Sequence, residues 1–262
     1  MTGLLVAPIG ACMFGLLATV ACWRLPRLRR AAALAGSAGL LLSGIALWAG
    51  GLPQSPASVH VGGWPEPFAI TLTVDGLSVL MVLLGGCVGL AATIYALAER
   101  RAESEAPWFH PLMQTLLLGT TGAFMAGDLF NLYVWFEILL VASFGLLATE
   151  SSLRRPGGAL HYVAMNLVSS ALFLLAVGLT YSTARSLNMA DLAPRLRHLA
   201  EVSPGLTHAI AGLFLLAFGI KAGLVPLHFW LPASYHRPSP AVSALFAGLL
   251  TKVGLYAMIR VL

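Results

Sequence analysis

The sequence predicts an all-α polytopic membrane protein with about eight transmembrane helices. Of its 262 residues, 58% are hydrophobic and only 10% are charged, whereas a soluble domain carries about 25% charged residues. Apolar runs of about 20 residues, the length that crosses the hydrocarbon core of a bilayer, recur along the chain. No polar stretch is long enough to form a separate soluble domain.

Eight apolar runs define the predicted spans. They cover roughly residues 3–23, 32–51, 76–98, 111–127, 129–149, 159–181, 207–230 and 241–262. The first run is longer than a signal-peptide core and precedes its arginines, so we interpret it as a span. Asp75 and Asp128 stand just before the third and fifth spans, where a carboxylate is typical of a helix N-cap.

The arginines predict how the spans are oriented. Loops after odd-numbered spans hold nine arginines and loops after even-numbered spans hold three. Because basic residues are enriched in cytoplasmic loops, this bias predicts an N-terminus outside the cell membrane, which for a bacterium is the inner membrane. The same bias explains the net charge of +5 without nucleic-acid binding.

Two loops are longer than the others. Residues 52–74 hold Pro53, Pro56, Pro65 and Pro67, which predicts an irregular outer cap. Residues 187–201 place leucines on one helical face and charged side chains elsewhere, which predicts a short amphipathic helix on the outer surface.

Three ionisable residues lie deep in apolar stretches. They are Glu137 and the two lysines of the chain, Lys221 and Lys252. An ionisable group at bilayer depth costs about 2.5–3.5 kcal/mol on insertion scales, so such groups usually mark a proton or ion path. We therefore predict that these three residues form a proton path.

Lys221 has the most unusual surroundings. Pro226 lacks an N–H group, so the carbonyl of Ala222 should lose its helical partner. A broken helix at membrane depth is tolerated where it lines a wet cavity or is buried in protein. Gly219 and Gly223 form a small-xxx-small pair that permits close helix approach. Together these features predict a hydrated proton site in a broken seventh span.

Other interpretations of the buried charges stay open. Glu137 is either protonated or paired with a cation from another helix, and Lys221 could pair with it only to lock the bundle. Lys252 has no acid in its own helix, although Tyr256 could share a hydrogen bond with it. His228 lies two turns after Lys221 and could relay a proton or be an ordinary core residue.

The remaining polar residues suggest no redox chemistry. Span six carries a polar stripe for which interhelical hydrogen bonding is the favoured interpretation; it consists of Tyr162, Asn166, Ser169 and Ser170. The three cysteines are isolated, and no nucleotide, haem or metal motif occurs. We expect no cofactor and no metal site.

Three stretches resemble a known family. Residues 128–137 (DLFNLYVWFE), 187–193 (LNMADLA) and 219–260 resemble the D-subunit family of the multisubunit Mrp-type Na⁺/H⁺ antiporters. The third stretch includes PLHFWLP at 226–232 and AVSALFAGLLTKVG at 241–254. The wider family includes antiporter-like subunits of respiratory complex I and of membrane-bound hydrogenases.

The resemblance implies an architecture and roles. Three peripheral helices (residues 1–110, with the outer loop 52–74) would precede a five-helix antiporter repeat (residues 111–262). Glu137 and Lys221 would form a modulating pair, and Lys252 would pass the proton onward. A second, inverted repeat would be missing, so the sequence is expected to be a fragment.

The resemblance also implies partners. The expected ones are other membrane subunits, protons and a monovalent cation. The rival interpretations are a proton-pumping subunit of complex I or a hydrogenase, and a structural subunit with a purely stabilising ion pair.

Overall fold

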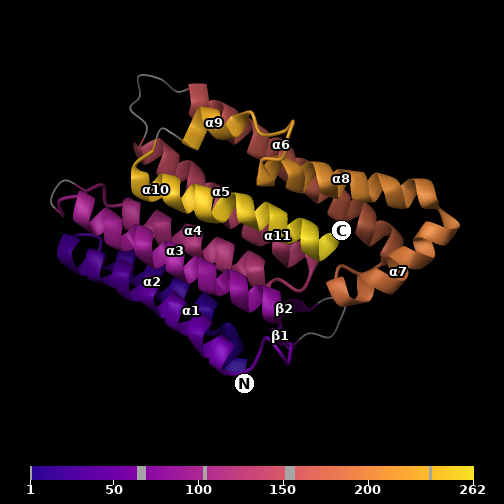
Figure 1. The fold of residues 1–262 in the computed structure, drawn as a ribbon, viewed down its shortest axis with the longest axis horizontal. Helices are drawn as coiled ribbons and strands as arrows, with labels where there is room; N and C mark the ends of the chain where they lie inside the picture. The colour runs from indigo at the N-terminus through magenta and orange to yellow at the C-terminus, as the bar shows by residue number, and fades with distance from the viewer. Residues whose placement is uncertain (1, 64–68, 103–104, 151–156, 236–237) are drawn as a thin grey trace.

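The computed structural model describes residues 2–63, 69–102, 105–150, 157–235 and 238–262, and it is almost entirely helical (Figure 1). The elements are α1 (Thr2–Ala21), α2 (Pro26–Ala49), β1 (Ala57–Val61), β2 (Ile70–Val74), α3 (Gly76–Glu99), α4 (Phe109–Met125), α5 (Leu129–Glu150), α6 (Gly157–Ala184), α7 (Met189–Val202), α8 (Pro204–Ala222), α9 (Trp230–Tyr235), α10 (Pro240–Leu245), a π-helical turn η1 (Phe246–Leu250) and α11 (Thr251–Val261). Pro65, Pro67, Arg154, Arg155 and Arg237 lie outside the described residues.

Seven helices within the described residues are long and apolar enough to cross a membrane, counting the continuous run Pro240–Val261 as one. In the place of the predicted fourth span is α4, which has 17 residues, nearly all of them buried by neighbouring helices. A helix surrounded by protein needs no lipid-facing surface, so α4 can lie among the spans without being apolar and long enough to be counted with them.

The seven apolar helices make the chain a multi-pass membrane protein, as predicted.

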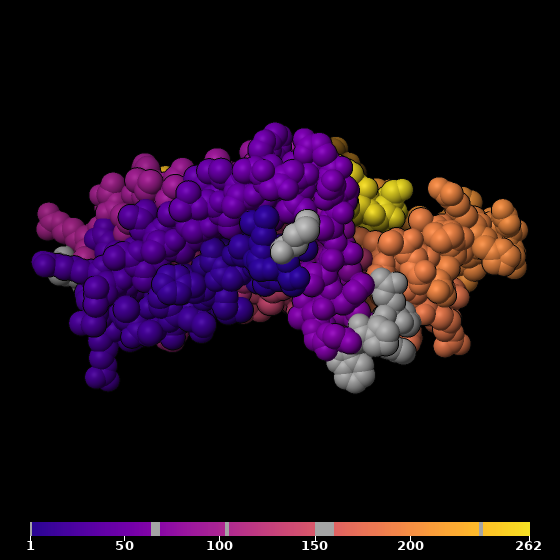
Figure 2. Space-filling model, turned by 90° about the horizontal axis from the view of Figure 1, so that it is seen from below, coloured from indigo at the N-terminus to yellow at the C-terminus, as the bar shows by residue number. Residues whose placement is uncertain are grey.

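The ends of the helices fall into two groups. An isolated bridge joins Leu72 of β2 to Ala126 after α4, and another joins Asp128 to Asn188 before α7. These contacts gather β1, β2, the α4–α5 junction and α7 at one end of the bundle, which we call the hairpin end (Figure 1). At the opposite end, Arg30 donates a hydrogen bond from α2 to the carbonyl of Leu97 in α3. Figure 2 shows the N-terminal helices covering one face, with the α7 region projecting beyond them.

The predicted irregular cap at 52–74 is partly wrong. Strands β1 and β2 pair antiparallel over five residues, from Ala57 opposite Val74 to Val61 opposite Ile70. Val59 and Val61 in β1 and four of the five residues of β2 (ITLTV) are β-branched, which favours extended backbone. These β-branched residues were the signal that the prolines obscured.

The expected helix caps are present. Oδ1 of Asp75 accepts a hydrogen bond from the backbone N–H of Ser78 at 2.9 Å, and Oδ1 of Asp128 accepts one from that of Asn131 at 2.7 Å. The predicted amphipathic helix is α7, and Asn188 caps its start through the N–H of Ala190. Each side chain satisfies a backbone donor that the first helical turn leaves free.

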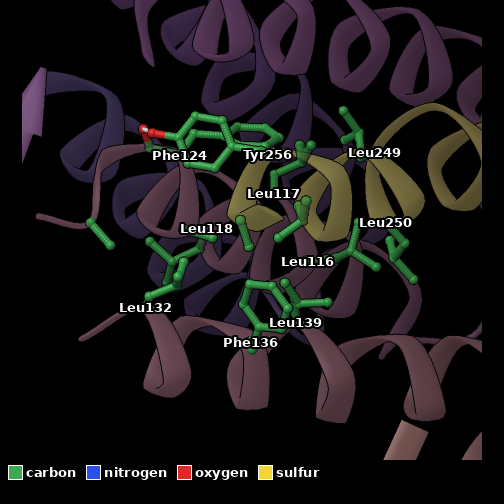
Figure 3. Packing of buried hydrophobic residues seen from close by; sticks show 14 of the residues in the cluster. Leu116, Leu117, Leu118, Phe124, Leu132, Phe136, Leu139, Leu249, Leu250 and Tyr256 are labelled. Carbon is green, nitrogen blue, oxygen red and sulfur yellow. Dashed lines mark hydrogen bonds between the residues drawn. The ribbon is translucent and has the colours of Figure 1, made fainter. Parts of the chain in front are cut away.

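Helices α4, α5 and α11 and the turn η1 form the part of the hydrophobic core that lies beside α5 (Figure 3). The labelled residues from these helices and from η1 are almost fully buried: Leu116, Leu117, Leu118, Phe124, Leu132, Phe136, Leu139, Leu249, Leu250 and Tyr256. Glycine lets α4 and α5 approach closely, because a Cβ on Gly119 would lie 2.7 Å from the nitrogen of Leu139. This packing fixes α5, the helix that carries Glu137.

Candidate proton site around Lys221

The predicted break in the seventh span is confirmed, but its position differs from the prediction. The span ends at Ala222 rather than continuing to residue 230, and Gly223 takes a left-handed φ of 70°. The N–H of Leu224 closes the helix end on the carbonyl of Gly219 at 2.9 Å. Glycine alone reaches this conformation without a steric cost. The helix therefore ends at Gly223, and Pro226 only prevents it from resuming.

A tryptophan satisfies the opened backbone. The indole Nε1 of Trp230 donates a hydrogen bond to the carbonyl of Ile220 at 2.9 Å, and the Trp230 side chain is almost fully buried. A buried carbonyl without a partner would cost about 1–3 kcal/mol. Trp230 begins the short helix α9, so the chain after the break folds back against the end of α8. The sequence offered no signal for this contact.

Lys221 lies in the last turn of α8 and is only 2% exposed. Its Nζ donates a hydrogen bond to Oδ1 of Asn166 on α6 at 3.0 Å and lies 5.5 Å from the ring centre of Phe136 on α5. Its backbone is pressed against α11, because a Cβ on Gly254 would lie 3.0 Å from the carbonyl carbon of Lys221. A buried ammonium is thus held by a neutral acceptor among three helices.

Glu137 acts on Lys221 from α5 without forming an ion pair. The two groups interact electrostatically, but within the described residues no Glu137 oxygen lies within 4.0 Å of the ammonium. The Glu137 Oε1 is buried and has no hydrogen-bond partner in this part of the chain. Of the interpretations left open, a direct ion pair that locks Glu137 to Lys221 is therefore not formed, and the lysine is turned to Asn166.

Three residues of the polar stripe of span six form interhelical hydrogen bonds as predicted, whereas the hydroxyl of Ser170 has no partner among the described residues. Tyr162 donates to Oγ of Ser143 on α5 at 2.8 Å, and Ser169 donates to the carbonyl of Ala217 on α8 at 2.7 Å. The role of Asn166 as the partner of Lys221 was missed. Its helical spacing placed it on the buried face, but only the packing of α6 against α8 brings it to the lysine.

Lys252 stands apart from this cluster. Its side chain is exposed on the surface of this chain, and Nζ donates to the carbonyl of Ala247 at 2.6 Å and to Oγ1 of Thr251 at 3.3 Å. The π-helical turn η1, Phe246–Leu250, ends two residues before Lys252. The suggested hydrogen bond to Tyr256 is wrong, because that hydroxyl donates to the carbonyl of Phe124 instead.

His228 lies in the irregular segment after the break. The shared helical face with Lys221 does not exist, because the helix ends at Gly223. His228 is half-buried and its Nδ1 is a buried atom without a hydrogen-bond partner among the described residues. A proton relay through His228 stays a prediction.

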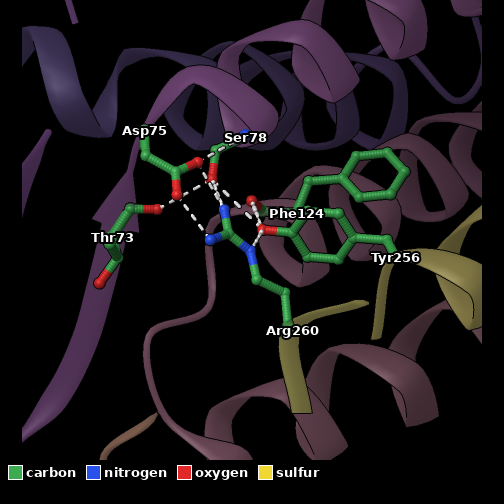
Figure 4. Close-up of polar contacts among 6 residues, drawn as sticks. All are labelled: Thr73, Asp75, Ser78, Phe124, Tyr256 and Arg260. Atoms are coloured by element: carbon green, nitrogen blue, oxygen red, sulfur yellow. Dashed lines mark hydrogen bonds and ion pairs between the residues drawn. The ribbon is translucent and has the colours of Figure 1, made fainter. Parts of the chain in front are cut away.

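A second polar cluster lies at the hairpin end (Figure 4). Arg260 on α11 donates to both carboxylate oxygens of Asp75 and to Oγ of Ser78, and its Nε donates to the hydroxyl of Tyr256 at 2.9 Å. Burial raises the pKa of Asp75, but hydrogen bonds from Arg260 and Ser78 and the Arg260 charge outweigh it and lower that pKa to about 2. The cluster ties α3 to the helix that carries Lys252.

Comparisons with known proteins agree with this architecture. The D subunit of the Na(+)/H(+) antiporter of Bacillus subtilis is 41% identical over 227 residues, which is 87% of this chain and 45% of that relative. The D subunit of a probable K(+)/H(+) antiporter of Rhizobium meliloti is 47% identical over 211 residues, which is 80% of this chain and 38% of that relative. The chain thus spans less than half the length of these curated relatives.

Solved structures share the fold. A chain of the Mrp complex from Dietzia sp. DQ12-45-1b superposes with a TM-score of 0.86 and 28% identity, covering 99% of this chain and 48% of that one. Respiratory complex I from Thermus thermophilus matches with a TM-score of 0.76 at 24% identity, over 97% of this chain and 53% of that one, which shows the fold alone.

A family model described as "NADH:quinone oxidoreductase/Mrp antiporter, TM" matches residues 126–262. This region is just over half of the chain and contains Glu137, Lys221 and Lys252. The resemblance seen in the motifs of the sequence is therefore confirmed, and the chain belongs to the NADH:quinone oxidoreductase/Mrp antiporter transmembrane family.

Proposed function

We propose that this chain is part of the proton-translocating subunit of a multisubunit monovalent cation/H⁺ antiporter in a bacterial inner membrane, with its N-terminus outside. The observation that carries the proposal is the open arrangement of Lys221 and Glu137 beside a broken helix. The names of the most similar relatives, Na(+)/H(+) and K(+)/H(+) antiporter subunits, support the choice of reaction.

The mechanism depends on the distance between two charges. A proton enters through water near the break after Gly223, and Lys221 accepts it. A nearby carboxylate favours the protonated lysine, and its withdrawal favours release, so a small movement of α5 relative to α8 can drive transfer. Lys252, with its amine on the surface of α11, receives the proton next.

The residue types suit this cycle. Lys221 is almost fully buried, so its ammonium lacks the hydration that would hold its proton on a surface lysine. The hydrogen bond to Asn166 replaces part of that hydration without neutralising the charge. The site can therefore carry a charge transiently, which a proton path requires.

The architecture separates two sides of the membrane. The amphipathic helix α7 lies at the hairpin end. Arg30 and Arg100, from the loops predicted to be cytoplasmic, lie at the other end of the bundle, near the start of α2 and the end of α3. We assign the hairpin end to the outside on this basis.

The test is cation-dependent proton flux in everted vesicles that contain the full-length protein with its partner subunits. Glu137→Gln and Lys221→Ala should each abolish the flux while assembly stays normal. Glu201→Gln is the matched control, because that side chain is 80% exposed. Unchanged flux in either buried variant would contradict the proposal.

Two other functions make different predictions. The fold shared with respiratory complex I is the reason to consider a proton-pumping subunit of complex I or of a hydrogenase. Such a subunit would co-purify with redox subunits. A structural subunit would tolerate replacement of both charges, because a buried pair is often replaceable without loss of stability. The double variant Glu137→Gln/Lys221→Met should then retain full flux.

A further inference from the structure

The ammonium of Lys221 has one acceptor within the described residues, and that acceptor carries no charge. Nζ donates to Oδ1 of Asn166 at 3.0 Å, and the two side chains are 2% and 1% exposed. An amide oxygen offers a dipole to a buried ammonium but no compensating charge. The contact therefore keeps the lysine in place without neutralising it.

The direction of the Asn166 amide is fixed by its own helix. Its Nδ2 donates to the backbone carbonyl of Tyr162 at 2.8 Å. A flipped amide would aim its NH₂ group at the ammonium, placing donor against donor. Tyr162 is itself immobilised, with its ring 5.3 Å from Trp230 and stacked 6.0 Å from Phe246. The oxygen of Asn166 is thus held toward Lys221.

We propose that Asn166 is a positioning residue that holds the Lys221 ammonium away from Glu137. The inference rests on the proposed function and adds a third member to its charge pair. Glu137 on α5 has a buried oxygen without a hydrogen-bond partner in the described part of the chain, so it offers a second acceptor for the Lys221 ammonium. Lys221 then exchanges between a neutral acceptor on α6 and a charged acceptor on α5.

The other elements packed around Lys221 offer no competing charge among the described residues. On α11, the residue beside Lys221 is Gly254, which carries no charge. On α6, the titratable residue nearest to Asn166 along the helix is Tyr162, and its hydroxyl donates a hydrogen bond to Ser143. The segment after the break carries the titratable side chains of His228 and Tyr235, and each has a buried atom without a hydrogen-bond partner in the described residues. Glu137 on α5 is the acidic side chain that interacts electrostatically with Lys221.

The test is the pH profile of cation-dependent proton flux in the full-length protein with its partner subunits. Asn166→Leu removes the acceptor but keeps the branched shape of the side chain, so Lys221 should turn to Glu137 and keep its proton to higher pH. We expect the flux optimum to move to higher pH by about one unit and the maximal flux to fall several-fold. Asn166→Gln keeps an amide oxygen, so its pH optimum and its maximal flux should lie between those of Asn166→Leu and the wild type.

Ser170→Ala is the matched control. Ser170 lies one turn further along α6 and is buried, and its hydroxyl has no hydrogen-bond partner among the described residues. Its profile should match wild type. A uniform fall of flux in Asn166→Leu with an unchanged optimum would show a packing role only and overturn the inference, as would a wild-type profile. If Asn166→Leu fails to assemble, Asn166→Ser must show the same displacement of the optimum.

The inference and the proposed function fail in different ways. If Glu137→Gln and Lys221→Ala leave the flux intact, the proposed function is wrong whatever Asn166 does. If both abolish the flux but the Asn166 variants keep the wild-type optimum, only the role of Asn166 is wrong.

Discussion

The guanidinium of Arg260 donates two hydrogen bonds of 2.5 Å to the carboxylate of Asp75, across a separation of 185 positions in the sequence. The pair joins the N-cap of α3 to the last turn of α11 (Figure 4). Since α11 carries Lys252, the position of that lysine depends on a contact at the hairpin end. The sequence showed the cap but not its partner.

Asp75→Asn should remove a contribution to the free energy of unfolding that depends on pH. The folded pKa of Asp75 is lowered from 3.8 to about 2, so its contribution is complete above about pH 4 and is lost as the pH falls toward 2. Thermal unfolding of the full-length protein in detergent at pH 7 should show a loss of about 1–2 kcal/mol. The loss should shrink between pH 4 and 2, and a loss that is constant with pH would contradict the assignment. Asp191→Asn, at an exposed ion pair, is the control.

Gly223→Ala should destabilise the broken helix. A Cβ at this left-handed residue would be strained and would overlap Cδ1 of Leu231. We expect a loss of about 1–3 kcal/mol in thermal unfolding. Gly219→Ala makes only an ordinary contact, 3.4 Å from Leu227, and should be close to neutral. Equal effects of the two variants would show that the left-handed turn is not required.

Trp230→Phe should leave the carbonyl of Ile220 without its donor. The smaller benzene ring also leaves a cavity in this buried site, so the lost hydrogen bond and the lost packing act together, and we expect at least about 1–3 kcal/mol of destabilisation. Trp48→Phe, at a side chain that is 54% exposed, should change the melting temperature little. A wild-type melting temperature for Trp230→Phe would mean that water replaces the indole.

Gly254→Ala should separate α11 from α8. The added Cβ would lie 2.6 Å from the backbone nitrogen of Ala222, and backbone cannot rotate away as a flexible side chain can. Overpacking of this kind costs about 1–3 kcal/mol. The variant should also reduce proton flux, since Lys221 lies beside the contact. Gly178→Ala is the control, because nothing lies within 4 Å of its added Cβ.

The sequence by itself determined that the chain is a polytopic membrane protein, the order of its spans, and which ionisable residues are candidates for a proton path. A lysine or glutamate in an apolar run is visible because hydrocarbon penalises charge whatever the fold. The caps at Asp75 and Asp128 and the amphipathic α7 were also predictable, since local hydrogen bonding and helical periodicity depend on nearby residues only.

Only the tertiary structure decided which of these residues meet. It turned Lys221 toward Asn166 rather than into an ion pair with Glu137, and it placed Lys252 on the surface of this chain. It also moved the helix break to Gly223, where Trp230 satisfies the freed carbonyl. These contacts join residues on different helices, so the packing of the bundle, and not local sequence, determines them.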